Sequence, residues 1–253
     1  MVEGRASMRD ARDWDPDTTL TRGSVHVPWS IQDTAVATGV VFVAFLAFLL
    51  VVGFASTLLN EDQRLRIAPW FAFASEAILL YAVWTFGIGK HATGWAILGF
   101  RRLRSLRLAW LAPAALLGSM AVTGVYALTT TALGIDRLSP EPIPDELLGG
   151  GALQQTMIAA ALATWVPLAE EVFFRGFLLQ GVASRYGSVW GVVVSAALFS
   201  VAHMTISTAL PIFGIGLILG AVYVKTRSLW IPMAAHSSQN LLAVVAALAA
   251  TSS

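Results

Sequence analysis

Seven stretches of this sequence are long, apolar and almost free of charge, which restricts the fold more than any other feature. They cover residues 34–59, 68–89, 108–133, 154–185, 188–204, 209–224 and 229–249. A membrane-spanning helix needs about 20 predominantly apolar residues in a row. The chain as a whole is 57% hydrophobic and 12% charged, whereas soluble domains carry about 25% charged residues. We therefore predict an all-α fold, a polytopic transmembrane helical bundle with about seven spanning helices.

The distribution of basic residues predicts the orientation of this bundle. If the seven stretches all span, twelve Lys and Arg fall on the side of the N-terminus and three on the other side. The positive-inside rule then places the N-terminus in the cytoplasm. We expect an integral protein of the cell membrane, with a flexible cytoplasmic tail at 1–33 and a single transmembrane domain at 34–253. Acids outnumber bases in the tail, which argues against a basic membrane anchor.

Two further features limit the function. The chain has no cysteine and a net charge of +1, which excludes disulfides and thiolate chemistry and gives no positive field to attract nucleic acid. The segment 94–108 begins with apolar residues and then contains four arginines, Arg101, Arg102, Arg104 and Arg107. It fits an amphipathic segment in the membrane interface and a basic loop equally well.

Charged residues inside the fourth apolar stretch mark a candidate site. The segment 165–180 reads WVPLAEEVFFRGFLLQ and contains Glu170, Glu171 and Arg175. Charges at membrane depth are costly unless they are paired or line a wet cavity, so they indicate function. Glu171 and Arg175 are four residues apart and can form a salt bridge along the helix, which leaves Glu170 as the freer carboxylate. Pro167 should bend the helix and open space beside the glutamates.

Two later stretches place further polar residues at helical spacing. Phe199 and His203 are four residues apart, as are His236 and Asn240, so each pair shares one helix face. A single buried histidine is more often a core residue than a catalyst. Together with Glu170, however, two histidines and an asparagine are the groups needed to activate water and to hold a developing oxyanion.

These motifs resemble those of the CPBP family of intramembrane proteases, which includes type II CAAX prenyl endopeptidases and bacterial proteins linked to bacteriocin self-immunity. The residues that carry the resemblance are EEVFFR, FSVAH and HSSQN, and we expect a catalytic core at 153–250. The resemblance implies that Glu170 and His203 activate water and that His236 and Asn240 form the oxyanion hole. It also implies that Glu171 and Arg175 brace the site, with Phe199 as a supporting residue, and that the substrate is a peptide or protein at the membrane.

The need for a metal and the class of function stay open at this stage. Glu170, His203 and His236 could bind zinc with a water as fourth ligand, but the sequence lacks HExxH, and a glutamate can activate water without a metal. We favour the metal-free reading. The alternatives to a protease are a non-hydrolytic immunity or scaffold protein and a proton-coupled transporter. The transporter is the weakest reading, because it needs no oxyanion-holding asparagine.

Overall fold

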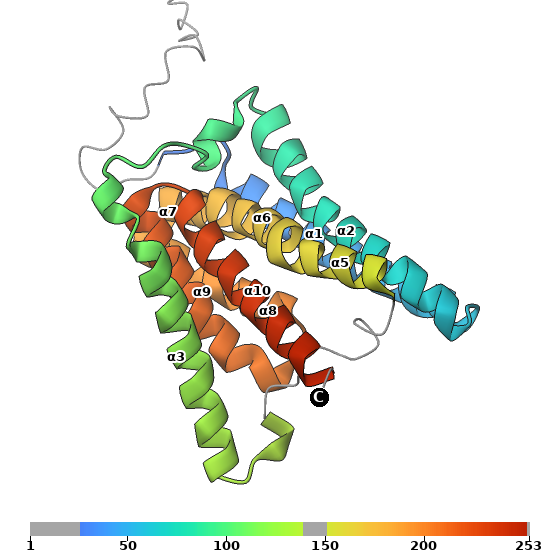
Figure 1. Cartoon of the computed structure of the whole chain (residues 1–253). Helices are drawn as coiled ribbons and strands as arrows, with labels where there is room; N and C mark the ends of the chain where they lie inside the picture. The colour runs from blue at the N-terminus through green and yellow to red at the C-terminus, as the bar shows by residue number, and fades with distance from the viewer. Residues whose placement is uncertain (1–25, 139–150, 252–253) are drawn as a thin grey trace, which may run out of the picture.

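The computed structural model describes residues 26–138 and 151–251, and helices with short connections make up all of this part of the chain. Prediction of an all-α fold is confirmed, because the described residues contain no strand. Figure 1 shows the helices crossing at several angles in place of a parallel bundle. In chain order the α-helices are α1 (Ile31–Thr57), α2 (Glu61–Val83), α3 (Leu111–Ala132), α5 (Ala152–Ala160), α6 (Val166–Glu170), α7 (Gln180–Tyr186), α8 (Ser188–Ala202), α9 (Ile206–Thr226) and α10 (Trp230–Thr251).

Six helices are long and apolar enough to cross a membrane by length and composition. The fifth predicted span, 188–204, corresponds to α8, which has 15 residues against the roughly 20 that a full crossing needs. It ends early because His203 caps it and Met204 then adopts a left-handed conformation with φ of 52°. The predicted bundle of about seven apolar helices is thus present within the described residues, as six helices long enough to span and one shorter apolar helix.

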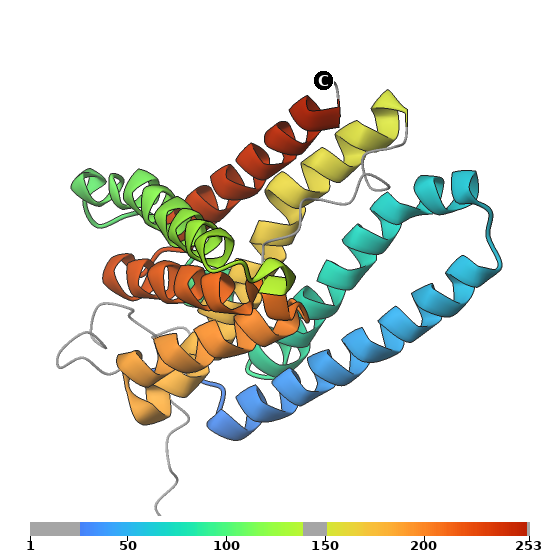
Figure 2. The same ribbon diagram turned by 90° about the horizontal axis from the view of Figure 1, so that it is seen from below.

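The helices form two groups on either side of a long central element. In both ribbon views α1 and α2 make an antiparallel hairpin, while α3, α9 and α10 lie together on the other side. The hairpin is most easily seen in Figure 2. The apolar run 152–186 passes between the two groups, and α8 packs against both α7 and α9. The main hydrophobic core gathers around this central element.

The central element contains two π-helical stretches beside Pro167. These are η7 (Ala161–Trp165) and η8 (Glu171–Leu179), and α6 with Pro167 separates them. Proline has no N–H to give, so the regular α-helical bonding cannot continue through it. Wider π turns are rare and are enriched at functional sites. Three carbonyl groups of η8 accept hydrogen bonds from side chains. Ser195 Oγ donates to Phe174 O (2.8 Å) and Trp29 Nε1 donates to Phe177 O (3.3 Å), both from distant parts of the chain. Gln180 Nε2, one turn further along, donates to Gly176 O (2.6 Å).

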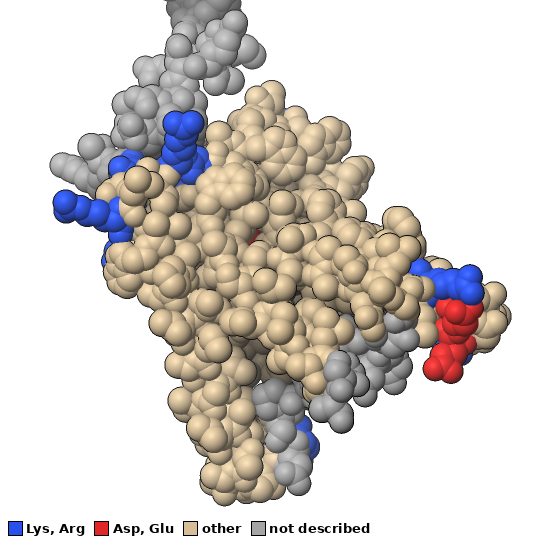
Figure 3. Space-filling model, viewed as in Figure 1, with Lys and Arg blue, Asp and Glu red and all other residues tan. Residues whose placement is uncertain are grey.

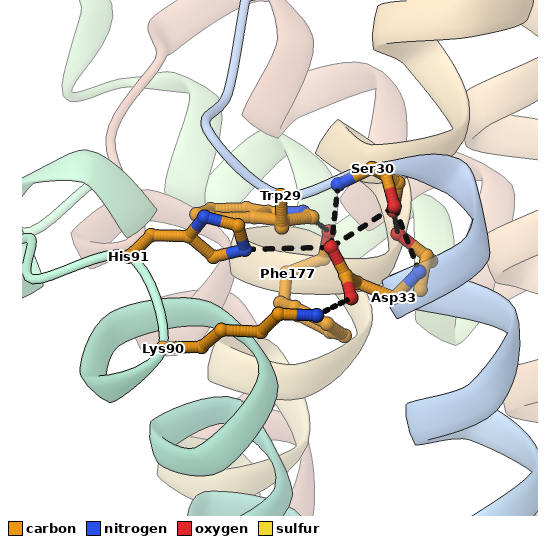
Figure 4. A network of polar contacts seen from close by, with 7 residues as sticks. Trp29, Ser30, Asp33, Lys90, His91 and Phe177 are labelled. Atoms are coloured by element: carbon orange, nitrogen blue, oxygen red, sulfur yellow. Dashed lines mark hydrogen bonds and ion pairs between the residues drawn. The ribbon is translucent and has the colours of Figure 1, made fainter.

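A polar network joins the start of α1 to Lys90 and His91, which follow α2 in the chain (Figure 4). Asp33 Oδ1 accepts a hydrogen bond from the Lys90 ammonium. Asp33 Oδ2 accepts from the backbone N–H and the hydroxyl of Ser30 and lies 3.4 Å from His91 Nε2. Trp29, only 1% exposed, stacks at a tilt on Phe177 of η8 with ring centroids 5.2 Å apart. The network therefore connects the start of α1 and residues 90–91 with the central element.

This network also corrects the predicted boundary of the N-terminal tail. Residues 29–33 are packed and capped, because Ser30 and Asp33 form a capping box at the start of α1. A Ser side chain and an acidic N3 residue satisfy two N–H groups that would otherwise lack partners. Residues 29–33 of the tail predicted at 1–33 are thus part of the packed fold, and residues 1–25 lie outside the part that the structure describes.

Candidate active site

A buried ion pair holds one histidine of the candidate site. Glu171 and Arg175, both on η8, have fully buried side chains, and Arg175 Nη1 donates to Glu171 Oε1 at 2.7 Å. The same oxygen lies 3.0 Å from His236 Nδ1 of α10. A carboxylate accepts hydrogen bonds, so this contact favours the tautomer with its proton on Nδ1. The predicted salt bridge is confirmed, and it also orients His236.

The second nitrogen of His236 faces the other glutamate. His236 Nε2 lies 3.5 Å from Glu170 Oε2, and the side chains of the two residues are 8% and 13% exposed. Glu170 has no ion pair with Arg175, as the sequence predicted, but His236 stands beside it. Its Oε2 is buried and lacks a hydrogen-bond partner among the described residues. Such a carboxylate oxygen can accept a hydrogen bond from a water molecule or a substrate.

Glu170 and His203 line one cavity of about 720 Å³. His203 follows α8 directly, and its Nδ1 lies 2.8 Å from Phe199 O. Because a carbonyl oxygen accepts, Nδ1 carries the proton in this contact and Nε2 keeps a lone pair. Glu76 of α2, 9% exposed, is a third ionisable residue in the lining. The cavity therefore joins a carboxylate and an imidazole that are 33 positions apart in the sequence.

Phe199 lies at the centre of the arrangement. Its ring is 4.8 Å from the His203 ring and 5.9 Å from the His236 ring, centroid to centroid. The Arg175 guanidinium lies over the same ring at 4.4 Å, a distance at which cation–π attraction operates. Phe199 is 2% exposed. It therefore acts as a rigid spacer that separates the two imidazoles and covers the buried cation.

Asn240 is placed differently from the other predicted residues. It lies one turn beyond His236 on α10, and its Nδ2 donates to Leu162 O in η7 at 2.8 Å. Neither Asn240 nor His236 belongs to the lining of the cavity that contains Glu170 and His203. The amide ties α10 to a carbonyl of the π-helical stretch η7. One of its two N–H groups is thus already engaged.

Sequence reasoning missed two features of the cavity. Glu76 is the one acidic or basic residue in the apolar run 68–89, and the fold brings it into the same cavity lining as Glu170. The signal was present, because an ionisable residue inside an apolar run indicates function by default. One apolar wall comes from α1, the first helix of the chain, through Val41, Phe42, Val43, Phe45, Leu46 and Leu49. No local pattern in the sequence connects that wall to the glutamates.

The residues proposed for zinc do not form a metal site. His236 Nε2 lies 3.5 Å from Glu170 Oε2 and its Nδ1 lies 3.0 Å from Glu171 Oε1, and His236 is not among the residues that line the cavity of Glu170 and His203. Among the described residues, no group of three His, Cys, Asp or Glu side chains is arranged to hold a metal ion. The zinc set Glu170, His203 and His236 is therefore not supported by the donor geometry. A zinc site needs at least three protein ligands converging on one position.

Comparison with known proteins shows what this chain is similar to in sequence. Residues 152–242 match the family model of Type II CAAX prenyl endopeptidase Rce1-like proteins, which confirms the resemblance carried by the three motifs and supports a membrane protease at the level of the family. An Escherichia coli protein described as "Uncharacterized 24.3 kDa protein" is 23% identical over 206 residues, covering 73% of this chain and 95% of that protein. "Putative membrane peptidase YdiL" of Bacillus subtilis is 23% identical over 79 residues, covering 31% of this chain and 32% of that protein. No solved structure matches the chain.

Proposed function

We propose that this chain is an intramembrane endopeptidase that uses Glu170 and His203 to activate water against a peptide bond of a membrane-associated substrate. The observation that supports the proposal most is that these two side chains, from different helices, line one cavity. A general base must reach the proton that it removes directly or through one water. A cavity lined by a carboxylate and a histidine with a free ring nitrogen provides such a position.

In the proposed reaction, the water oxygen attacks the scissile carbonyl carbon while one of its protons passes to the Glu170 carboxylate. His203 Nε2 accepts a hydrogen bond from the same water and directs its lone pair. The proton on Glu170 then passes to the amide nitrogen as the C–N bond breaks, which releases an amine and a carboxylic acid. No step requires a metal, and general acid–base catalysis of this kind contributes roughly 10²–10⁴-fold.

His236 and Asn240 take roles adjusted to the contacts around them. His236 lies between the two glutamates, so we assign it first to the positioning of Glu170. The resemblance also implies an oxyanion hole from His236 and Asn240. Because one amide N–H of Asn240 is bonded to Leu162, its other N–H is the donor left for the oxyanion.

The lining of the cavity supports a substrate with an apolar part. Most of its residues are aliphatic or aromatic, and the polar ones are Glu76, Glu170, His203 and Thr205. Its volume of about 720 Å³ lies within the roughly 300–1,000 Å³ that ligand pockets usually have. A prenylated CAAX-type C-terminal segment combines a peptide bond with an apolar chain, and it is the first substrate class to test. We also propose that the N-terminus lies on the cytoplasmic side, as the basic residues indicate.

The test uses purified protein in a neutral detergent with a fluorogenic farnesylated peptide and a panel of membrane-anchored peptides. Glu170→Gln should lower kcat by roughly 10²–10⁴-fold while the protein stays folded. Glu61→Gln is the matched control, since Glu61 is exposed at the start of α2. If Glu170→Gln cleaves as fast as Glu61→Gln, the proposed role of Glu170 is wrong and the scaffold interpretation replaces the protease. The same conclusion follows if neither the parent protein nor any variant cleaves a substrate while the protein still protects cells from a bacteriocin.

A further inference from the structure

A cluster of cations lies where the segment 94–108 meets the turn between α9 and α10. The segment forms two short 3₁₀ turns, η4 (Trp95–Leu98) and η5 (Leu106–Leu108), and is not one continuous amphipathic helix. Arg101 and Arg102 follow η4, while Lys225 and Arg227 belong to the end of α9. In the view of Figure 3, Lys and Arg collect toward the ends of the molecule and leave a broad uncharged face between them.

Three hydrogen bonds hold the residues that carry two of these cations next to each other. Arg101 Nε donates to Arg227 O at 2.6 Å, and Ser228 Oγ donates back to Arg101 O at 3.0 Å. The Leu229 N–H donates to Gly99 O at 2.9 Å. Three bonds between the two segments therefore fix the relative position of the guanidinium-bearing residues 101 and 227. The pair is built into the fold and does not depend on surface side chains meeting by chance.

Arg227 occupies an unusual position for a charged residue. Its φ is +54°, in the left-handed region that favours glycine and asparagine. Burial lowers the pKa of its guanidinium, and the charges of Arg101 and Arg104 act in the same direction. Among the ion pairs of the described residues, none joins Arg101 or Arg227 to a carboxylate. Two neighbouring guanidinium groups repel each other, so an anion between them would be stabilised.

Exposed tryptophans surround the pair. Trp95, Trp110 and Trp230 are 45%, 59% and 54% exposed. Phe100 packs edge-on against both Trp95 and Trp230, and the Lys225 ammonium lies 6.0 Å from the centre of the Trp110 ring. Trp and basic residues together are typical of the level of lipid headgroups. Three candidate spans also begin or end here, at Leu106, Thr226 and Trp230.

We propose that Arg101 and Arg227 bind the phosphate of an anionic phospholipid at this end of the bundle. Guanidinium groups suit phosphate because their N–H groups match its oxygens two at a time. The tryptophans would contact the glycerol and the upper acyl chains. The bound lipid would clamp the α9–α10 turn, and α10 carries His236 only nine positions beyond Arg227. This site is separate from the proposed cavity and does not depend on the proposed function.

The test measures phospholipid binding to the full-length protein in a neutral detergent, by native mass spectrometry and by thermal unfolding. Phosphatidylglycerol should bind more tightly than phosphatidylcholine and raise the unfolding temperature more. A cation near an anionic surface contributes roughly fivefold to binding, so loss of both should weaken phosphatidylglycerol binding by roughly thirtyfold. The double variant is Arg101→Gln with Arg227→Asn. Glutamine keeps an N–H for the Arg227 carbonyl, and asparagine tolerates the left-handed backbone.

Arg64→Gln is the matched control. Arg64 Nε also donates to a backbone carbonyl, that of Leu59, but in the exposed turn between α1 and α2. This variant should retain the phosphatidylglycerol preference. A double variant that binds phosphatidylglycerol as tightly as the control overturns the proposal. Equal stabilisation by inorganic phosphate and by phosphatidylglycerol would also overturn it, because the ligand would then be a free phosphate. If the double variant unfolds, Arg101→Gln alone should still show roughly fivefold weaker binding.

Discussion

The buried pair of Glu171 and Arg175 offers a sharp quantitative test of how the site is held. Arg175→Met removes a hydrogen bond to a carboxylate, which contributes about 1.5–3 kcal/mol, and a cation–π contact of about 0.5–2 kcal/mol. Both partners of the ion pair are fully buried, so Glu171 would be left buried without its cation. We expect the free energy of unfolding to fall by about 3–5 kcal/mol, the range found when one partner of a buried pair is removed.

A double variant separates stability from positioning. Glu171→Leu together with Arg175→Met replaces the ion pair by apolar side chains, a change that is often close to neutral in stability. We therefore expect the double variant to regain most of the stability that Arg175→Met loses. His236 would nevertheless lose the acceptor 3.0 Å from its Nδ1. Nitrogen-15 NMR of the histidine rings should then show a different tautomer for His236.

Equilibrium unfolding in mixed micelles of dodecyl maltoside and sodium dodecyl sulfate measures the change in stability. Arg185→Met is the matched control, because Arg185 is an exposed arginine over the Tyr186 ring in α7. The reasoning is refuted if Arg175→Met is no less stable than Arg185→Met. It is also refuted if the double variant keeps the tautomer of the parent protein, since Glu171 would then not orient His236.

Three further predictions concern the cavity and its surroundings. Chelators should leave hydrolysis unchanged, because His236 faces two carboxylates and the proposed reaction uses no metal. Glu76→Gln should lower kcat/KM about tenfold with the fold retained, because it removes an acid from the cavity lining. The magnitude assumes the loss of one hydrogen bond between the Glu76 carboxylate and the substrate or a bound water, since a hydrogen bond to a charged group contributes at least this much. Asn240→Ala should reduce the free energy of unfolding by about 1–3 kcal/mol, because it leaves the Leu162 carbonyl without its donor.

Each of these has a result that would contradict it. Full loss of activity with a chelator, reversed by zinc, would restore the metal-dependent reading. If Glu76→Gln is as active as the exposed Glu61→Gln control, Glu76 is a structural residue and takes no part in the reaction. For Asn240, equilibrium unfolding identical to that of the parent protein would mean that its bond to Leu162 does not stabilise the helix pair.

The sequence predicted the salt bridge and the irregular central helix because their signals are local. Glu171 and Arg175 are four residues apart on one helix, and helical geometry alone brings them together. Pro167 likewise predicted an irregular helix, and the π-helical stretches η7 and η8 lie on either side of α6, which contains this proline. The length of α8 was harder to predict, because it depends on the left-handed turn at Met204. Apolar composition continues past that point, so hydropathy gave no sign of the helix end.

Contacts between distant segments needed the tertiary structure. Glu76 precedes Glu170 by 94 positions, and the pairing of α2 with the central helix alone places both carboxyls in one cavity. The same holds for Asp33 with Lys90 and His91. Apolar residues on a helix show that it is buried in protein or lipid, but they do not say which neighbour it meets.

From its residues alone, this protein is determined to be a membrane-embedded helical chain with charged and imidazole groups at fixed helical spacing. Lipid offers the backbone no water to bond, so long apolar runs must form helices, and charged groups inside them are costly unless they are paired or line a wet cavity. Only the folded arrangement decided that Glu170 and His203 share a cavity, that His236 stands between two glutamates and that Asn240 turns to Leu162. Helix periodicity sets the face on which a side chain lies, whereas packing between helices sets what that face meets.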